Sequence, residues 1–148
     1  MNKLITTACF ILLAALLSGV GIAADNFKTA GKGVQYRDLI QGTGDHAEVG
    51  DVATIHFTSW LDDHGRQGRE IYATRGQRAP VSFVIGTDRV MQGWNEGVIG
   101  MQAGGRRLVN VPAGPAFGAR GVPNVVPPNT GMIFVIDLLA LDKHPNKH

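Results

Sequence analysis

Residues 80–101, PVSFVIGTDRVMQGWNEGVIGM, carry the strongest local signals in the chain. The first part, residues 81–85, is short and rich in valine, isoleucine and phenylalanine, which predicts a strand. Glycines within the segment that follows each cost a helix about 1 kcal/mol against alanine, so a helix there needs a sheet to lie on, with Trp94 as the natural anchor. The apolar residues that recur at helical spacing, and so predict one short amphipathic helix, are Val90, Trp94, Val98 and Met101.

The segments on either side contain further predicted strands. The clearest alternation runs over residues 52–61. Residues 41–45, before this segment, and residues 62–65, after it, are rich in turn-forming residues. A polar loop continues from there to Arg69. Strands, one helix and then strands again favour an antiparallel α+β domain. The other predicted strands are residues 34–40, 70–74, 106–111 and 132–141.

A long loop over residues 112–130 joins the last two predicted strands and is rich in proline and glycine. A loop of this length without secondary structure is uncommon in a compact domain and is often functional. We therefore expect the functional site near this loop.

The N-terminus has the pattern of a secretory signal peptide. Lys3 precedes an apolar run over residues 4–20, and small residues follow, so that cleavage after Ala23 or Ala24 fits equally well. The alternative is a retained membrane anchor, because the run approaches the roughly 20 residues that span a bilayer. We expect export to the periplasm, without stable membrane association after cleavage. The predicted division is a signal peptide at 1–24, a flexible arm at 25–32, one domain at 33–142 and a tail at 143–148.

The composition excludes several classes of protein. The chain of 148 residues has a formal net charge of +2 and scattered basic residues, which argues against nucleic-acid binding. The one cysteine, Cys9, lies in the predicted signal peptide, so we expect no disulfide after cleavage. About 124 residues then remain, enough for one hydrophobic core, and we expect a monomer.

The polar motifs favour structural interpretations over catalytic ones. Residues 42–44 lack the third glycine of a dinucleotide loop and predict a turn. Asp62, Asp63 and His64 are consecutive and cannot all converge on one ion, so we interpret them as a solvated hairpin tip. We expect neither a metal nor a cofactor.

The histidines outside that hairpin also have structural interpretations. His56 alternates with apolar neighbours, so it points away from their face and has a solvent-side or structural role. His144 and His148 could give weak metal affinity, but a frayed terminus is the better interpretation.

The aromatic residues are spread along the chain, and core packing is their ordinary interpretation. The sequences around them, however, resemble the FK506-binding family of peptidyl-prolyl isomerases. The resemblance covers roughly residues 33–142. The segments that carry it are residues 55–58, 80–86, 89–98, 111–118, 125–130 and 134–139.

The resemblance implies an antiparallel half-barrel sheet of five or six strands wrapped around one short helix. It also implies a pocket floored by Trp94, in which the N–H of Met91 binds a substrate carbonyl. The expected activity is X–Pro isomerisation during folding of exported, proline-containing polypeptides, without covalent or acid–base catalysis. The residues that it assigns to substrate binding are Phe57, Tyr72, Phe83, Val90, Met91, Trp94, Phe117, Val126 and Phe134, with Val81 and Val125 at the edge.

The sequence departs from the usual residues of the family in this pocket. Phe57 and Phe117 stand where tyrosines are usual, Tyr72 stands where an aspartate is usual, and Ile71 replaces a phenylalanine. Each lost hydrogen bond is worth about 0.5–1.5 kcal/mol, so we expect reduced activity and weak affinity for the macrolide FK506. The alternative function is a proline-binding or chaperone-like module with little or no isomerase activity.

Overall fold

The computed structural model describes residues 26–76 and 78–145, which form short strands and one α-helix. The elements in chain order are β1 (Lys28–Thr29), the 3₁₀ turn η1 (Gly31–Gly33), β2 (Gln35–Ile40), β3 (Thr43–His46), β4 (Val52–Asp63), β5 (Arg66–Ala73), β6 (Val81–Val84), α2 (Gln92–Val98), β7 (Gln102–Ala103), β8 (Arg106–Val111) and β9 (Met132–Asp142).

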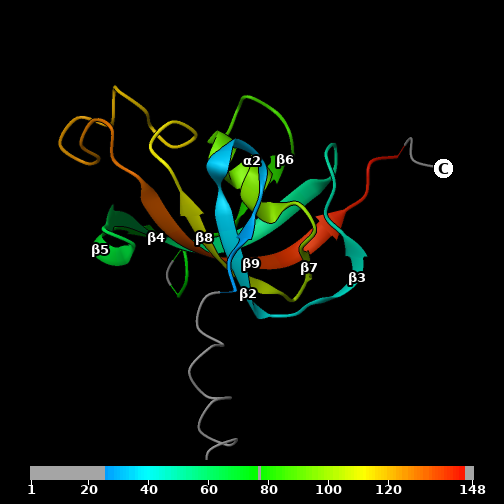
Figure 1. Ribbon diagram of the computed structural model, residues 1–148. Coiled ribbons are helices and arrows are strands. Elements are labelled where there is room, and N and C mark those ends of the chain that lie inside the picture. Colours follow the sequence, from blue (N-terminus) through cyan, green and yellow to red (C-terminus); the bar gives the residue numbers. More distant parts are fainter. Residues whose placement is uncertain (1–25, 77, 146–148) are drawn as a thin grey trace, which may run out of the picture.

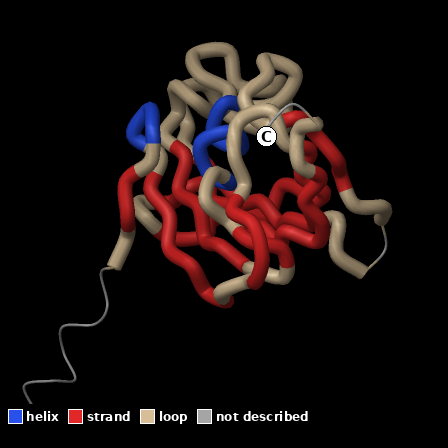
Figure 2. Tube along the Cα trace, turned by 90° about the vertical axis from the view of Figure 1, so that its right-hand side faces the viewer, coloured by secondary structure: helices blue, strands red, loops and turns tan. Residues whose placement is uncertain are grey.

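Seven of these strands form one antiparallel sheet in the order β1-β2-β8-β9-β4-β5, with β6 paired to β4 off this path. The first residues of the long β4 pair with β6 and its later residues pair with β5. The sheet curves, and α2 and the long loops lie on one side of it (Figures 1 and 2). The predicted α+β fold is confirmed. In the described chain the sheet has seven strands rather than five or six, because the two-residue β1 extends one edge.

The glycines of α2 let the helix lie close to β8. A Cβ on Gly93 would lie 2.4 Å from Cγ1 of Val111, and a Cβ on Gly97 would lie 2.8 Å from Cγ1 of Val109. Both glycines are buried, as is Val98 at the end of the helix. Glycine at these two positions lowers the helix propensity of α2 but allows the helix backbone to lie directly against the sheet.

The N-terminal residues fold onto the sheet, although the sequence predicts a flexible arm over residues 25–32. Lys28 pairs with Tyr36 of β2, and the N–H of Ala30 donates to the carbonyl oxygen of Val34 at 2.7 Å. The predicted signal peptide lies outside the described residues. Within those residues, no helix has the length and apolar character needed to cross a bilayer.

The β4–β5 hairpin closes more tightly than the sequence predicts. The segment that the sequence predicts as a polar loop is already paired with β4 from Arg66, which lies opposite Asp63. Gly65 takes the left-handed turn position with φ +82°, and its N–H donates to Oδ1 of Asp62 at 2.7 Å. Residues 62–64 are exposed, as expected of a solvated hairpin tip.

The small second sheet replaces a predicted turn. Within the predicted turn at 41–45, Thr43 starts β3, which pairs with β7. A Cβ on Gly42 would lie 2.3 Å from the carbonyl oxygen of Gln102. The pairing thus depends on a close approach between segments far apart in the sequence.

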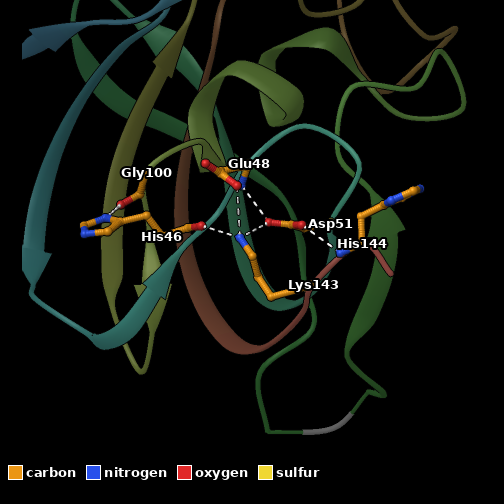
Figure 3. A network of polar contacts seen from close by, with 6 residues as sticks. All are labelled: His46, Glu48, Asp51, Gly100, Lys143 and His144. Atoms are coloured by element: carbon orange, nitrogen blue, oxygen red, sulfur yellow. Dashed lines mark hydrogen bonds and ion pairs between the residues drawn. The ribbon is translucent and has the colours of Figure 1, made fainter. Parts of the chain in front are cut away.

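The C-terminal residues are anchored, although the sequence predicts a frayed tail from residue 143 (Figure 3). Nζ of Lys143 lies 2.6 Å from Oδ2 of Asp51 and 3.3 Å from Oε2 of Glu48. The N–H of His144 donates to Oδ1 of Asp51 at 3.1 Å. Asp51 is fully buried, so these contacts compensate its charge. His148 lies outside the described residues.

Candidate functional site

Three phenylalanine rings from three strands surround the indole of Trp94 on α2. The centroid of Phe57, on β4, lies 4.7 Å from that of Trp94 with 64° between the ring planes. Phe83 on β6 and Phe134 on β9 lie at 5.6 Å and 6.0 Å. Tilted and edge-to-face pairs at these distances stabilise beyond simple burial. We call these four residues the aromatic cluster.

Exposure separates the floor of the site from its rim. The three phenylalanines of the aromatic cluster are at most 6 % exposed. Tyr72 is 41 % exposed and stacks on Phe57 with centroids 5.8 Å apart, and Phe117 is 38 % exposed. The cluster is therefore sealed by the core below and borders solvent above. The partly exposed residues that pack against the core here are Val81, Val90, Met91 and Trp94.

Two separate hollows border the core that contains the aromatic cluster, and they share no lining residue. Phe83 and Val90 line a cavity of about 490 Å³. Val126, which is buried in the core, lines a second cavity of about 320 Å³ together with Arg69 of β5 and other residues of the long loop. The predicted residues thus border concave surface in two separate places.

The structure brings together most of the residues that the resemblance assigns to substrate binding. Phe57, Phe83, Trp94 and Phe134 touch, and Tyr72 stacks at their edge. Phe117 is the exception, because among the described residues its ring makes no contact with another aromatic ring. The role of Phe117 in substrate binding, like that of the other assigned residues, stays a prediction.

The N-terminus of α2 is fixed by contacts that the sequence did not reveal. The side chain of Asn95 accepts a hydrogen bond from the N–H of Gly86 at 2.8 Å and donates to the carbonyl oxygen of Thr87 at 2.7 Å. These bonds hold the segment that leads to Met91, the N-cap residue of the helix. Helix geometry gives the N–H of an N-cap residue no partner inside the helix, so the N–H of Met91 is available to a ligand. The only sequence signal for these contacts is the polar Asn95 beside the apolar residues of the predicted amphipathic helix.

A buried threonine fixes the backbone next to Phe57. Oγ1 of Thr74 accepts the N–H of Phe57 at 2.9 Å and lies 2.9 Å from Nδ1 of His56. The N–H of Thr74 donates to the carbonyl oxygen of Phe57 at 2.9 Å. His56 thus has a structural contact, in agreement with the prediction, whereas no sequence pattern indicated the role of Thr74.

The long loop after β8 is ordered by its own hydrogen bonds. Val122 and Val126 exchange backbone bonds of 2.8 Å and 2.9 Å, and the N–H of Asn129 donates to the carbonyl oxygen of Gly118 at 2.8 Å. The N–H of Gly93 on α2 donates to the carbonyl oxygen of Pro115 at 2.9 Å. The loop is therefore fastened to the helix that carries Trp94.

A second tie joins the long loop to β5. Nη2 of Arg69 donates to the carbonyl oxygen of Val125 at 2.8 Å. The long loop, yellow to orange in Figure 1, rises on the same side of the molecule as β5. The loop, β5 and α2 thus enclose the site from three directions.

The described part of the site offers apolar rings and a few polar groups to a ligand. Among the described residues, no group of three or more His, Cys, Asp or Glu side chains could hold a metal ion. Nε1 of Trp94 is buried without a hydrogen-bond partner in the described chain. Such an atom is ordinarily satisfied by water or a ligand. The arrangement suits an apolar ring that carries nearby polar amide groups.

Comparisons with known proteins point to one family. A sequence profile described as FKBP-type peptidyl-prolyl cis-trans isomerase matches residues 44–139. An FK506-binding protein of Neisseria meningitidis serogroup A is 36 % identical over 104 residues, which is 70 % of this chain and 92 % of the relative. The peptidyl-prolyl cis-trans isomerase Fkbp12 of Drosophila melanogaster is 34 % identical over 111 residues, 74 % of this chain and 99 % of the relative.

The fold has a counterpart among solved structures. The crystal structure of AtFKBP13 matches with a TM-score of 0.68 and covers 78 % of this chain and 98 % of that chain. The sequence identity is 24 %, so this likeness concerns the fold.

Proposed function

This chain belongs to the FKBP-type peptidyl-prolyl cis-trans isomerases, and we propose that it accelerates X–Pro isomerisation in exported polypeptides. One observation carries the proposal for this site. Trp94 packs against Phe57, Phe83 and Phe134, yet remains partly exposed at the floor of the site. A flat apolar floor within apolar walls suits a pyrrolidine ring.

The proposed mechanism is preferential binding of the twisted amide. Resonance keeps an X–Pro bond planar, with a rotation barrier of about 18–20 kcal/mol. Rotation removes that resonance and makes the carbonyl less polar, so an apolar, water-poor site favours the twisted form over the hydrated planar form. The N–H of Met91 holds the substrate carbonyl, and the ties from Asn95 and Pro115 keep α2 in place. Each 1.36 kcal/mol of preference for the transition state raises the rate about tenfold.

The polar groups at the rim set the strength of catalysis. Phe57 and Phe117 have no hydroxyl, and the hydroxyl of Tyr72 stands where a carboxylate is usual in the family. These departures favour a second candidate function, a proline-binding module with little activity. They also support weak rather than tight binding of FK506, the ligand for which several relatives are named.

A matched pair of tryptophan variants tests the proposed function. Trp94→Leu removes the floor of the site. Trp60→Leu is the control: Trp60 lies on β4, as Phe57 does, but its side chain points to the opposite face of the sheet. We expect purified protein to accelerate isomerisation of a short X–Pro peptide, and Trp94→Leu to reduce kcat/KM by about tenfold or more through lost transition-state contacts. Trp60→Leu should keep the wild-type rate.

The outcomes separate the two candidate functions. Peptide binding with only the uncatalysed rate leaves the binding module. Equal loss of activity in the two variants contradicts a site built on Trp94.

Placement in the cell belongs to the same proposal. The N-terminal sequence supports export through a cleaved signal peptide, and we propose that the mature chain is a monomer. Fractionation of producing cells, with mass measurement of the mature chain, tests the location and the cleavage after Ala23 or Ala24. Light scattering tests the monomer.

A further inference from the structure

Positive charge gathers on one side of the aromatic cluster. Arg69 and Arg120 both line the cavity of about 320 Å³ that also contains Val126. Arg78 lies over the ring of Tyr72, with its guanidinium carbon 4.3 Å from the ring centroid. Tyr72 in turn stacks on Phe57, so this cation is one ring away from the aromatic cluster. We call Arg69, Arg78 and Arg120 the arginine rim.

No acidic side chain neutralises the arginine rim in the described part of the chain. None of its three guanidinium groups takes part in an ion pair there. The residues that line the cavity beside Arg69 and Arg120 are valine, proline and asparagine. Glu70 is the sequence neighbour of Arg69, but strand alternation points it to the other face of β5.

The separate cavity lined by Phe83 and Val90 has a different charge. Phe83 and Val90 line it together with one acid, Asp88, and one base, Arg89. The two cavities beside the aromatic cluster therefore differ in electrostatics: one presents only cations and the other presents both signs.

The arginine rim is held by the same contacts that build the site. Nη2 of Arg69 is fixed on the carbonyl oxygen of Val125, which leaves its other N–H groups directed to further partners. Arg120 follows Phe117 in the long loop, where the N–H of Gly121 donates to the carbonyl oxygen of Phe117 at 3.0 Å. Val126, which lines the cavity with Arg69 and Arg120, belongs to the core against which Trp94 packs, so these guanidinium groups border the same core as the proposed proline site.

We propose that the arginine rim selects substrates with an aspartate or glutamate close to the proline, on one side of it only. The inference rests on the proposed function and names the substrate class of that site. A carboxylate accepts paired hydrogen bonds from a guanidinium group, which makes arginine the suitable side chain for this recognition. The cavity that contains Asp88 gives no such preference to the other side of the proline.

Peptides that differ by a single carboxylate test the proposal. The neutral parent places glutamine at the two positions before and the two positions after proline, and each test peptide replaces one glutamine with glutamate. We expect kcat/KM to rise about three- to tenfold when glutamate stands on one side of the proline, the gain that two exposed ion pairs with the arginine rim would give. Glutamate on the other side of the proline should leave kcat/KM unchanged. The gain should shrink in high salt.

Two variants locate the effect. Arg120→Gln removes one member of the arginine rim, whereas Arg66→Gln removes an exposed arginine at the hairpin end of β5. We expect the ratio of kcat/KM for glutamate over glutamine to fall by at least half in Arg120→Gln and to keep its wild-type value in Arg66→Gln. Calorimetric binding of the same peptides should show the same ratios.

The outcomes separate this inference from the proposed function. If the neutral parent is accelerated but glutamate gives no gain on either side, the arginine rim does not select substrates while the isomerase stands. A gain that survives in Arg120→Gln, or that appears equally on both sides, also overturns the inference. If no peptide is accelerated, the proposed function fails, and the calorimetric ratio alone decides whether the rim binds carboxylates.

Discussion

Arg107 on β8 donates a hydrogen bond from Nη1 to the carbonyl oxygen of Ile99 at 2.8 Å, immediately after the end of α2. The same nitrogen donates to the carbonyl oxygen of Gly97 at 3.0 Å, and Nε donates to Oδ1 of Asp38 at 2.7 Å. The last carbonyl groups of a helix have no partner inside it, so this buried guanidinium caps α2 from the sheet. The position of Trp94 therefore depends on a sheet residue that binds the C-terminal end of the helix.

Replacement of Arg107 by lysine should destabilise the protein. A lysine keeps the charge but lacks the planar set of donors that reaches two carbonyls and one carboxylate together. We expect Arg107→Lys to lower the free energy of unfolding by about 1.5–3 kcal/mol in urea titrations. The exposed Arg66→Lys serves as the control and should stay within about 0.5 kcal/mol of wild type. Equal stability of the two variants contradicts the capping role.

Alanine in place of Gly93 should also destabilise, against its better helix propensity. The added Cβ would lie 2.4 Å from Cγ1 of Val111, so the helix must move away from the sheet. We expect a loss of about 1–3 kcal/mol on thermal or urea unfolding, as for other overpacked cores. Gly114→Ala is the matched control, because nothing lies within 4 Å of its added Cβ. A more stable Gly93→Ala protein would show that propensity outweighs packing here.

The parts of the fold that could be predicted are those with a local signal. Residues 52–61 alternate between apolar and polar side chains, and β4 begins at the predicted residue, Val52. Two-residue β1 and β7 have no such signal, because their pairing depends on partners distant in the sequence. The anchoring of Lys143 likewise depends on Asp51, some 92 residues away.

The candidate site shows the same division. The aromatic residues could be predicted from the family resemblance, and the structure brings Phe57, Phe83, Trp94 and Phe134 together. The polar groups that hold these aromatic residues in place could not be predicted. Thr74, for example, reaches the backbone of Phe57 only because β5 pairs with β4. Exposure was also unpredictable, since it depends on how the long loop lies over the sheet.

The buried carboxylate of Asp51 should make the protein less stable as the pH falls into the acid range (Figure 3). Burial by itself raises the pKa of Asp51, but hydrogen bonds from Lys143 and from the N–H groups of His144 and Glu48 outweigh it and lower the pKa overall. A carboxyl group with a lowered folded-state pKa stabilises the protein at pH above its unfolded value of about 3.9, and this contribution is lost as the pH falls through the folded-state pKa.

We therefore expect wild type to lose more stability between pH 7 and pH 3 than Asp51→Asn, in urea unfolding across that range at about 25 °C. Asp63→Asn, at the exposed hairpin tip, is the control and should follow wild type. If Asp51→Asn does not fold, Lys143→Gln tests the same contact from its partner side and should also flatten the acid dependence. Parallel pH profiles in wild type and in both variants of the contact would show that it does not govern acid stability.

A tyrosine at position 117 should strengthen the site. The ring of Phe117 is 38 % exposed, so an added hydroxyl stays hydrated until a ligand accepts its hydrogen bond. Such a bond is worth about 0.5–1.5 kcal/mol, and we expect Phe117→Tyr to raise kcat/KM and FK506 affinity about two- to tenfold, by peptide assay and calorimetry. Phe27→Tyr is the control, because Phe27 lies under the guanidinium of Arg37 and lines a different cavity, together with Leu108 and Ile133. If Phe117→Tyr changes neither quantity, residue 117 does not contact ligands, and the rim of the site is formed by Tyr72 and the valines around it.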